Sequence, residues 1–224
     1  MKKVKFRKGS KFLRAGAAAF VVSGLAIGSL PATPAFASSD GTGVVINEAY
    51  LSGGSQGAAY KNKFIELYNS SNLSVSLKGW SVQYRAAGGD GRSAAVLHLT
   101  GKIPAKGHYL IQGGSNGSDG VELPSPDVSG RKFDPKGTTG TLILARTTEA
   151  LTLPTGSVTK TSNVVDLLGY GTSNTYETEV ADAPSSNKDV RSITRIDAVD
   201  TDNNKADFVL TSTITPQNAT GTQR

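Results

Sequence analysis

The sequence contains no cysteine and only two histidines, His98 and His108. Without thiols the core has to be stable by packing alone, although exported proteins often rely on disulfides. A zinc site would have to come from two scattered imidazoles, and neither lies in an H-E-x-x-H or similar metal spacing. The sequence therefore argues against a disulfide scaffold and against a zinc enzyme.

Acidic residues are missing from the first 37 positions, which hold seven lysines and arginines. This basic start, an apolar run over 15–30 and an A-x-A ending at Ala37 have the layout of a secretory signal peptide. The run is shorter than the about twenty apolar residues that a permanent membrane span needs. We therefore predict a signal peptide over 1–37, a secreted mature protein without a membrane span, and a bacterial, Gram-positive source.

Positive charge is scarce once this leader is removed. Seven of the 24 lysines and arginines belong to it, so 17 bases remain against all 18 acids, and the net charge changes from +6 to −1. Proteins dedicated to nucleic acids carry a basic footprint that neutralises several phosphates. The charge therefore argues against nucleic acid as the partner and leaves an unidentified extracellular macromolecule.

Helical periodicity is absent after residue 37, where apolar residues come in short β-branched or aromatic runs between turn-forming residues. In the run 64–68, Phe64, Glu66 and Tyr68 would share one face of a strand. The sole tryptophan, Trp80, is expected in the core. The runs predict about nine short strands and an all-β sandwich or barrel; they span 44–50, 64–68, 80–84, 95–100, 109–112, 141–145, 164–170, 192–196 and 207–210.

Two long polar loops, 113–140 and 172–188, interrupt the strands. Loops of this length in a compact domain often carry function. Tyr176, in the second loop, and Tyr84 are candidate platforms on which a polysaccharide could stack. These loops are the places where we expect a binding site.

Candidate catalytic residues are few. The hydrolase pattern G-x-S-x-G occurs twice, around Ser55 and Ser115, but no helical pattern follows either serine, as the nucleophile elbow requires. Glu48 and Glu66 could form a glycosidase-like pair across two strands. Strand carboxylates are more often in ion pairs, for which Lys61, Lys63 or an arginine could be the partner. No coherent catalytic set follows, and we expect a protein that is not an enzyme.

The stretch R-I-D-A-V-D-T-D-N-N-K-A-D-F, residues 195–208, is the densest cluster of oxygen-bearing side chains. Asp200, Asp202 and Asp207 are candidate ligands of calcium, which takes six to eight oxygens. The EF-hand count fails, because glycine is missing at position six (Lys205) and glutamate at position twelve (Thr211). The alternative is a structural turn in which aspartate and asparagine bond backbone amides, with Phe208 entering the core. No other cofactor is indicated.

The order of these runs resembles the lamin tail domain family. The resemblance rests on V-V-I-N-E-A-Y, K-N-K-F-I-E-L-Y-N-S-S, V-S-L-K-G-W-S-V-Q-Y, G-K-I-P-A-K-G-H-Y-L-I and the closing acidic stretch followed by I-T-P-Q-N. It implies an immunoglobulin-like β-sandwich over 43–218. The polar composition of the chain's end predicts a flexible tail over 219–224. The resemblance also implies a scaffold or binding role and no catalytic residues.

Three functions remain open from the sequence. The first is a secreted, non-catalytic binding or scaffold module of the lamin tail type. The second is an extracellular enzyme, or an accessory of one, that acts on nucleic acid; this draws only on the enzymes beside which such domains occur. The third is a module that attaches to cell wall or another polysaccharide.

Overall fold

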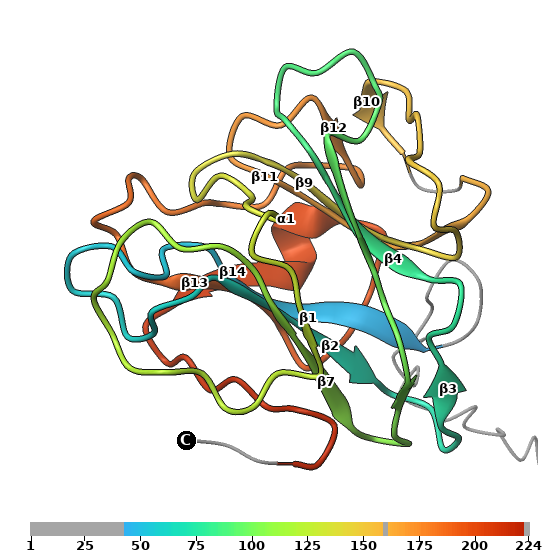
Figure 1. The fold of residues 1–224 in the computed structure, drawn as a ribbon. Coiled ribbons are helices and arrows are strands. Elements are labelled where there is room, and N and C mark those ends of the chain that lie inside the picture. The colour runs from blue at the N-terminus through green and yellow to red at the C-terminus, as the bar shows by residue number, and fades with distance from the viewer. Residues whose placement is uncertain (1–42, 159–160, 222–224) are drawn as a thin grey trace, which may run out of the picture. The chain divides into compact units, whose positions relative to one another are not determined.

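The computed structural model describes residues 43–158 and 161–221, and β-strands dominate this part of the chain (Figure 1). The predicted signal peptide, residues 1–37, lies outside the described residues. Within them, no helix has the length and apolar character needed to cross a membrane.

The larger sheet has six strands in the order β14-β13-β1-β2-β7-β8. Its neighbours pair antiparallel, except β7 and β8, which are parallel. A bulge lies between Ile46 and Glu48 of β1. The strands are β1 (Val44–Tyr50), β2 (Phe64–Asn69), β7 (His108–Gln112), β8 (Val128–Ser129), β13 (Ser192–Arg195) and β14 (Phe208–Thr211).

The second sheet has four antiparallel strands in the order β11-β9-β4-β5. They are β4 (Ser81–Arg85), β5 (Ala95–His98), β9 (Gly140–Ala145) and β11 (Val164–Tyr170). Two small pairs complete the strands: β3 (Val75–Ser76) with β6 (Lys102–Ile103), and β10 (Gly156–Ser157) with β12 (Thr175–Tyr176). A single-turn helix, α1 (Asn204–Asp207), precedes β14.

The main core lies between the two sheets, because alternate residues of each sheet point inward. Ile65 and Leu67 of β2 meet Leu142 and Leu144 of β9 in one buried cluster that also holds Trp80. The predicted faces of β2 are confirmed, since Phe64 belongs to a second cluster on the outer side of the sheet. The fold is thus the immunoglobulin-like sandwich that the sequence predicts, and all nine predicted runs form strands.

The C-terminal segment lies against the outer face of the six-stranded sheet and is held there by three acids. Alternate backbone amides donate to these carboxylates, because an extended chain presents every second N–H to the same side. The acceptors are Glu48, Glu66 and Asp127, and the donors are the amides of Thr215, Gln217 and Ala219. The predicted flexible tail, residues 219–224, begins inside this docked segment; residues 222–224 lie outside the described range.

Candidate functional site

The strongest electrostatic feature of the fold is the buried side chain of Arg195, at the end of β13. Its Nη2 donates to both carboxylate oxygens of Asp166, at 2.7 and 2.8 Å, and its Nε donates to the carbonyl of Ile46 at 2.9 Å. The same Asp166 carboxylate accepts the Ile46 amide at 2.5 Å. Asp166 lies on β11, so a bidentate ion pair joins the two sheets at the bulge of β1.

Two aspartates of the acidic loop reach the same guanidinium. Arg195 Nη1 lies 3.4 Å from Asp200 and 3.3 Å from Asp207. The guanidinium also lies over the ring of Phe208, 4.3 Å from its centroid. Asp207 accepts both the amide and the hydroxyl of Thr201, at 2.8 and 2.5 Å. The loop therefore closes the core around a buried cation.

The predicted calcium ligands do not come together as a set. Asp200 and Asp207 are buried beside Arg195, whereas Asp202 is half-buried and its backbone has a left-handed φ of 56°. Among residues 43–158 and 161–221, the acids close enough to share an ion are Asp166, Glu177 and Asp200, whose oxygens lie within 4.8 Å of one another. Two of these three lie outside the acidic loop, so spacing within that loop could not indicate them.

Burial changes the protonation of this cluster. Desolvation, reinforced by the charge of Asp166, raises the pKa of Glu177 to about 10 and that of Asp200 to about 7, while Arg195 opposes both shifts. Glu177 is therefore protonated at neutral pH. Its Oε2 accepts a hydrogen bond from Asn204 Nδ2 at 2.9 Å.

Asn204, the first residue of α1, ties the acidic loop to the segment around β12. Its Oδ1 accepts the amides of Gly169 and Glu177, at 2.8 and 3.0 Å, and its Nδ2 donates to the carbonyl of Leu167 at 2.7 Å. The Lys205 amide adds a bond to the carbonyl of Glu179 at 3.2 Å. These bonds support the structural interpretation of the acidic loop, in which Asp200 also accepts the Asp202 amide at 3.2 Å and Asn203 caps α1.

The segment Thr175–Tyr176–Glu177 alternates between the inside and the outside of the protein. Thr175 is fully buried and its hydroxyl bonds Arg85, which is buried as well. Glu177 is buried on the acidic cluster. Because side chains of an extended segment alternate, Tyr176 between them points to the solvent side, where it is half-buried. The segment packs closely on Gly169, which only a glycine permits, since a Cβ there would lie 2.4 Å from the Thr175 carbonyl.

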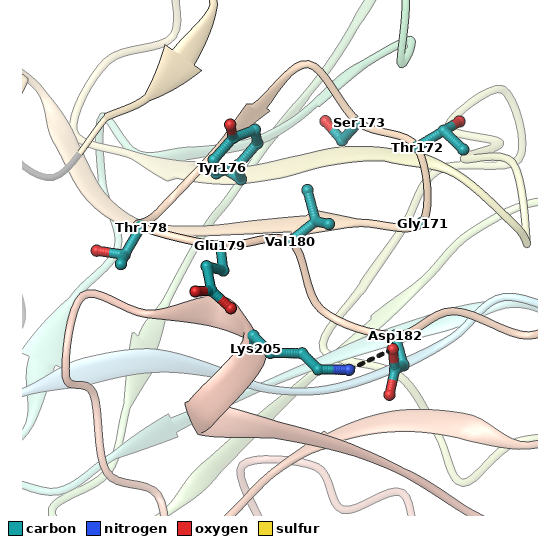
Figure 2. A pocket seen from close by; sticks show the side chains of 9 residues that line it. All are labelled: Gly171, Thr172, Ser173, Tyr176, Thr178, Glu179, Val180, Asp182 and Lys205. Carbon is teal, nitrogen blue, oxygen red and sulfur yellow. Dashed lines mark hydrogen bonds and ion pairs between the residues drawn. The ribbon is translucent and has the colours of Figure 1, made fainter.

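An open cavity of about 500 Å³ lies beside Tyr176 (Figure 2). It is lined by eight residues of the segment 171–182 and by Lys205 of α1. Lys205 Nζ pairs with Asp182 Oδ1 at 2.6 Å, and both side chains are well exposed. The remaining polar lining consists of Thr172, Ser173, Thr178 and Glu179. We call this cavity the Tyr176 pocket.

Residues 37–172 match the family model described as Lamin Tail Domain, which is more than half of the chain. The chain belongs to the lamin tail domain family. The resemblance seen in the sequence is thereby confirmed. The matched residues include the strands β1 to β11, and so strands of both sheets. The Tyr176 pocket and the acidic loop lie almost entirely beyond the matched residues.

Other comparisons add little to this lamin tail domain. A solved structure, of a DUF4876 family protein from Bacteroides thetaiotaomicron VPI-5482, aligns with a TM-score of 0.48 and 10% identity. The alignment covers 81% of this chain and 70% of that one. No curated protein matches the sequence.

The two tyrosines considered as stacking platforms have different settings in the lamin tail fold. Tyr84 is only 7% exposed, belongs to the core, and donates its hydroxyl to the carbonyl of Thr139 at 3.2 Å. The prediction that Tyr84 forms a platform is therefore wrong. Tyr176 lines a cavity, as a platform must.

The two G-x-S-x-G stretches are loops that pack against each other. The Asn116 amide donates to the carbonyl of Gly53 at 2.8 Å, and its side chain bonds the hydroxyl of Ser55 at 3.0 Å. A Cβ on Gly54 would lie 2.1 Å from Ser115 Oγ. The glycines of the pattern thus serve this close contact between loops.

The acids considered as a glycosidase pair serve the fold. Glu66 Oε1 lies 2.8 Å from His108 Nδ1 and accepts Asn47 Nδ2 at 2.8 Å, while its Oε2 holds the C-terminal segment. The predicted lysine partners are wrong: Lys61 pairs with Glu122 and Lys63 with Asp134. Glu48 is buried, which raises its pKa to about 7 mainly by desolvation. Sequence reasoning did not indicate His108 as the partner of Glu66. The signal that could have indicated it was the place of His108 at the start of the strand run that pairs with β2.

Proposed function

We propose that this lamin tail domain is a secreted binding module that holds an extracellular macromolecule without chemical turnover. The observation that carries the proposal is the Tyr176 pocket, an exposed polar cavity on a segment anchored by buried residues on both sides. Binding sites need side chains held in place by such support. The polar groups that could suggest catalysis are instead engaged within the fold.

The nucleic-acid alternative has less support. Catalysis would need a base, a nucleophile or metal, and substrate charge stabilisation in one cavity. Glu66 bonds His108, Asn47 and the C-terminal segment, and the serines of both G-x-S-x-G loops bond neighbouring loops. The Tyr176 pocket holds two carboxylates and a single ammonium group, a balance that repels phosphates.

The experiment uses the chain without residues 1–37. The purified protein is mixed with Gram-positive cell walls, insoluble polysaccharides and DNA-cellulose, and the bound fraction is measured after sedimentation. The same preparation is incubated with DNA and RNA in Mg²⁺, Mn²⁺ or Ca²⁺. We expect retention on at least one polymer and intact nucleic acids.

Two results would overturn this proposal. Robust cleavage of DNA or RNA that co-purifies with the protein and persists in independent preparations would make it an enzyme. If the fraction of protein in the pellet is the same without polymer as with each of the polymers, the proposed binding function is wrong. Export is tested separately, by expressing the full chain in a Gram-positive host; protein cleaved near Ala37 is expected in the medium, and retention of the uncleaved chain in the cells would contradict secretion.

A further inference from the structure

We infer that the Tyr176 pocket binds a neutral sugar unit of an extracellular glycan, with the ring of Tyr176 as its stacking surface. This inference rests on the proposed binding function and names the class of its ligand. It follows from four properties of the pocket: its aromatic ring, its paired polar groups, its charge and its rigid support.

The aromatic ring is the first property. Tyr176 is half-buried beside an open cavity of about 500 Å³ (Figure 2). A pyranose has one face made mainly of C–H groups, which packs on the face of an aromatic ring, while its hydroxyls stay at the edge. The volume lies within the range of small-molecule sites. A single sugar unit with its neighbours extending into solvent fits such an open cavity.

The polar groups are the second property. Lys205 Nζ and Asp182 Oδ1, 2.6 Å apart, place a donor beside an acceptor at one edge of the pocket. Adjacent sugar hydroxyls can each donate and accept, so two of them can bond such a pair together. Glu179 supplies another acceptor, and the hydroxyls of Thr172 and Thr178 can take either role.

The charge of the pocket is the third property, and it excludes other ligands. Glu179 and Asp182 outnumber Lys205, which is already paired, so phosphate, nucleic acid and anionic polymers would be repelled. Among the residues that the structure describes, Val180 is the one apolar side chain that lines the pocket beside Tyr176. A peptide partner would need a more apolar, desolvated centre. A neutral, hydroxyl-rich ligand satisfies both conditions.

Rigid support is the fourth property. Thr175 and Glu177 are buried on either side of Tyr176. Gly171 has a left-handed φ of 66° and packs so closely that a Cβ added to it would lie 2.1 Å from the Thr138 carbonyl. Lys205 comes from α1, whose first residue bonds the same segment. The ring and the polar edge are therefore positioned before a ligand arrives, which limits the entropy that binding costs.

The test measures binding of neutral tetrasaccharides of glucose, mannose and N-acetylglucosamine to the chain without residues 1–37. Saturation-transfer NMR identifies binders and calorimetric titration gives their Kd. We expect at least one to bind, with an affinity that does not change with salt. Tyr176→Ala should weaken that affinity by about tenfold or more, and Tyr176→Phe, which keeps the ring, by less than about threefold.

Two further variants complete the design. Asp182→Ala removes a well exposed side chain whose ion pair with Lys205 should add little to stability, and it should also weaken binding severalfold. Tyr68→Ala removes a half-buried tyrosine that lies at a different cavity, and it should leave the affinity unchanged. Circular dichroism and thermal melting establish that each variant is folded.

Specific outcomes overturn the inference. They are the failure of every neutral tetrasaccharide to bind at about 10 mM, binding that Tyr176→Ala and Asp182→Ala leave unchanged, or binding that salt abolishes. If the protein still sediments with cell walls or DNA in any of these cases, the proposed binding function stands and only the sugar site is wrong. If no polymer retains it, the proposed function fails as well.

Discussion

Replacing Arg195 with methionine should destabilise the protein more than other single substitutions at a charged residue. Methionine retains much of the aliphatic stem, but it removes the donors to Asp166, Ile46 and Val199. The Arg195 and Asp166 side chains are both 0% exposed, so water cannot replace the lost cation. Removing one partner of such a buried pair costs about 3–5 kcal/mol in the free energy of unfolding.

The melting temperature translates this energy into a direct measurement. For a domain of this size, 1 kcal/mol corresponds to a shift of about 2–4 °C, so Arg195→Met should melt about 6–20 °C lower. Urea unfolding, followed by circular dichroism and by the fluorescence of Trp80, gives the free energy itself. Arg195→Lys should lie between the two proteins, because a single ammonium group keeps the charge but cannot donate to Asp166 and also to the carbonyls of Ile46 and Val199.

The matched control is Lys61→Met, which breaks an exposed ion pair with Glu122. Its side chains are 45% and 62% exposed, so we expect a change below about 0.5–1 kcal/mol. If Arg195→Met is as stable as this control, the buried cluster does not hold the two sheets together. The argument that the acidic loop is structural would then be refuted.

Three other predictions concern the same regions. Because folding raises the pKa of Glu177 from 4.5 to about 10 and that of Asp200 from 3.8 to about 7, the unfolded chain loses protons first as pH rises. Stability should therefore fall between about pH 5 and 7, by about 1.4 kcal/mol per pH unit for each of the two groups. Glu177→Gln should make this fall smaller and should be more stable than the unchanged protein at about pH 8 but not at about pH 4. If urea unfolding gives the same pH dependence of the free energy of unfolding for both proteins, the assignment of the raised pKa to Glu177 is contradicted. Calcium bound by Asp166, Glu177 and Asp200 would have to displace protons and compete with Arg195. We therefore expect the same melting temperature in excess Ca²⁺ and in chelator. A saturable rise of the melting temperature with Ca²⁺ that is lost in Glu177→Gln would establish the metal site. Ending the chain at Thr213 uncovers Glu48, Glu66 and Asp127 and should lower the free energy of unfolding by about 3 kcal/mol, and an unchanged urea midpoint would show that the C-terminal segment does not stabilise the sheet.

The strands were predictable because their signal is local. Alternation in F-I-E-L-Y and apolar runs such as T-L-I-L-A depend on neighbouring residues, and the sheets bury the faces that this alternation indicates. The lamin tail family pattern then supplied the topology that local signals lack. The single-turn α1 was missed because four residues are too few for helical periodicity.

The buried cluster was not predictable from spacing, because its members are far apart. Arg195 is 29 residues from Asp166, and Ile46, whose backbone bonds both, is 120 residues from Asp166. A weaker signal was present: Asp166 interrupts the apolar run V-V-D-L-L and Arg195 the run S-I-T-R-I. A charge inside a buried strand requires a partner, so these two opposite charges could have been matched. The oxygen-rich loop suggested calcium because aspartate and asparagine serve backbone caps and metal ions with the same atoms.

Stability and binding should be coupled in this protein, because the acidic loop serves both. Arg195 holds Asp200 and Asp207 at the two ends of the turn, and α1 within that turn supplies Lys205 to the Tyr176 pocket. Arg195→Met should therefore weaken sugar binding even though Arg195 does not line the pocket, whereas Lys61→Met should not. A bound sugar should in turn raise the melting temperature of the unchanged protein, since a ligand that binds only the folded state stabilises it. An Arg195→Met protein that is folded, less stable and yet binds the sugar with full affinity would show that the pocket is positioned by β12 alone.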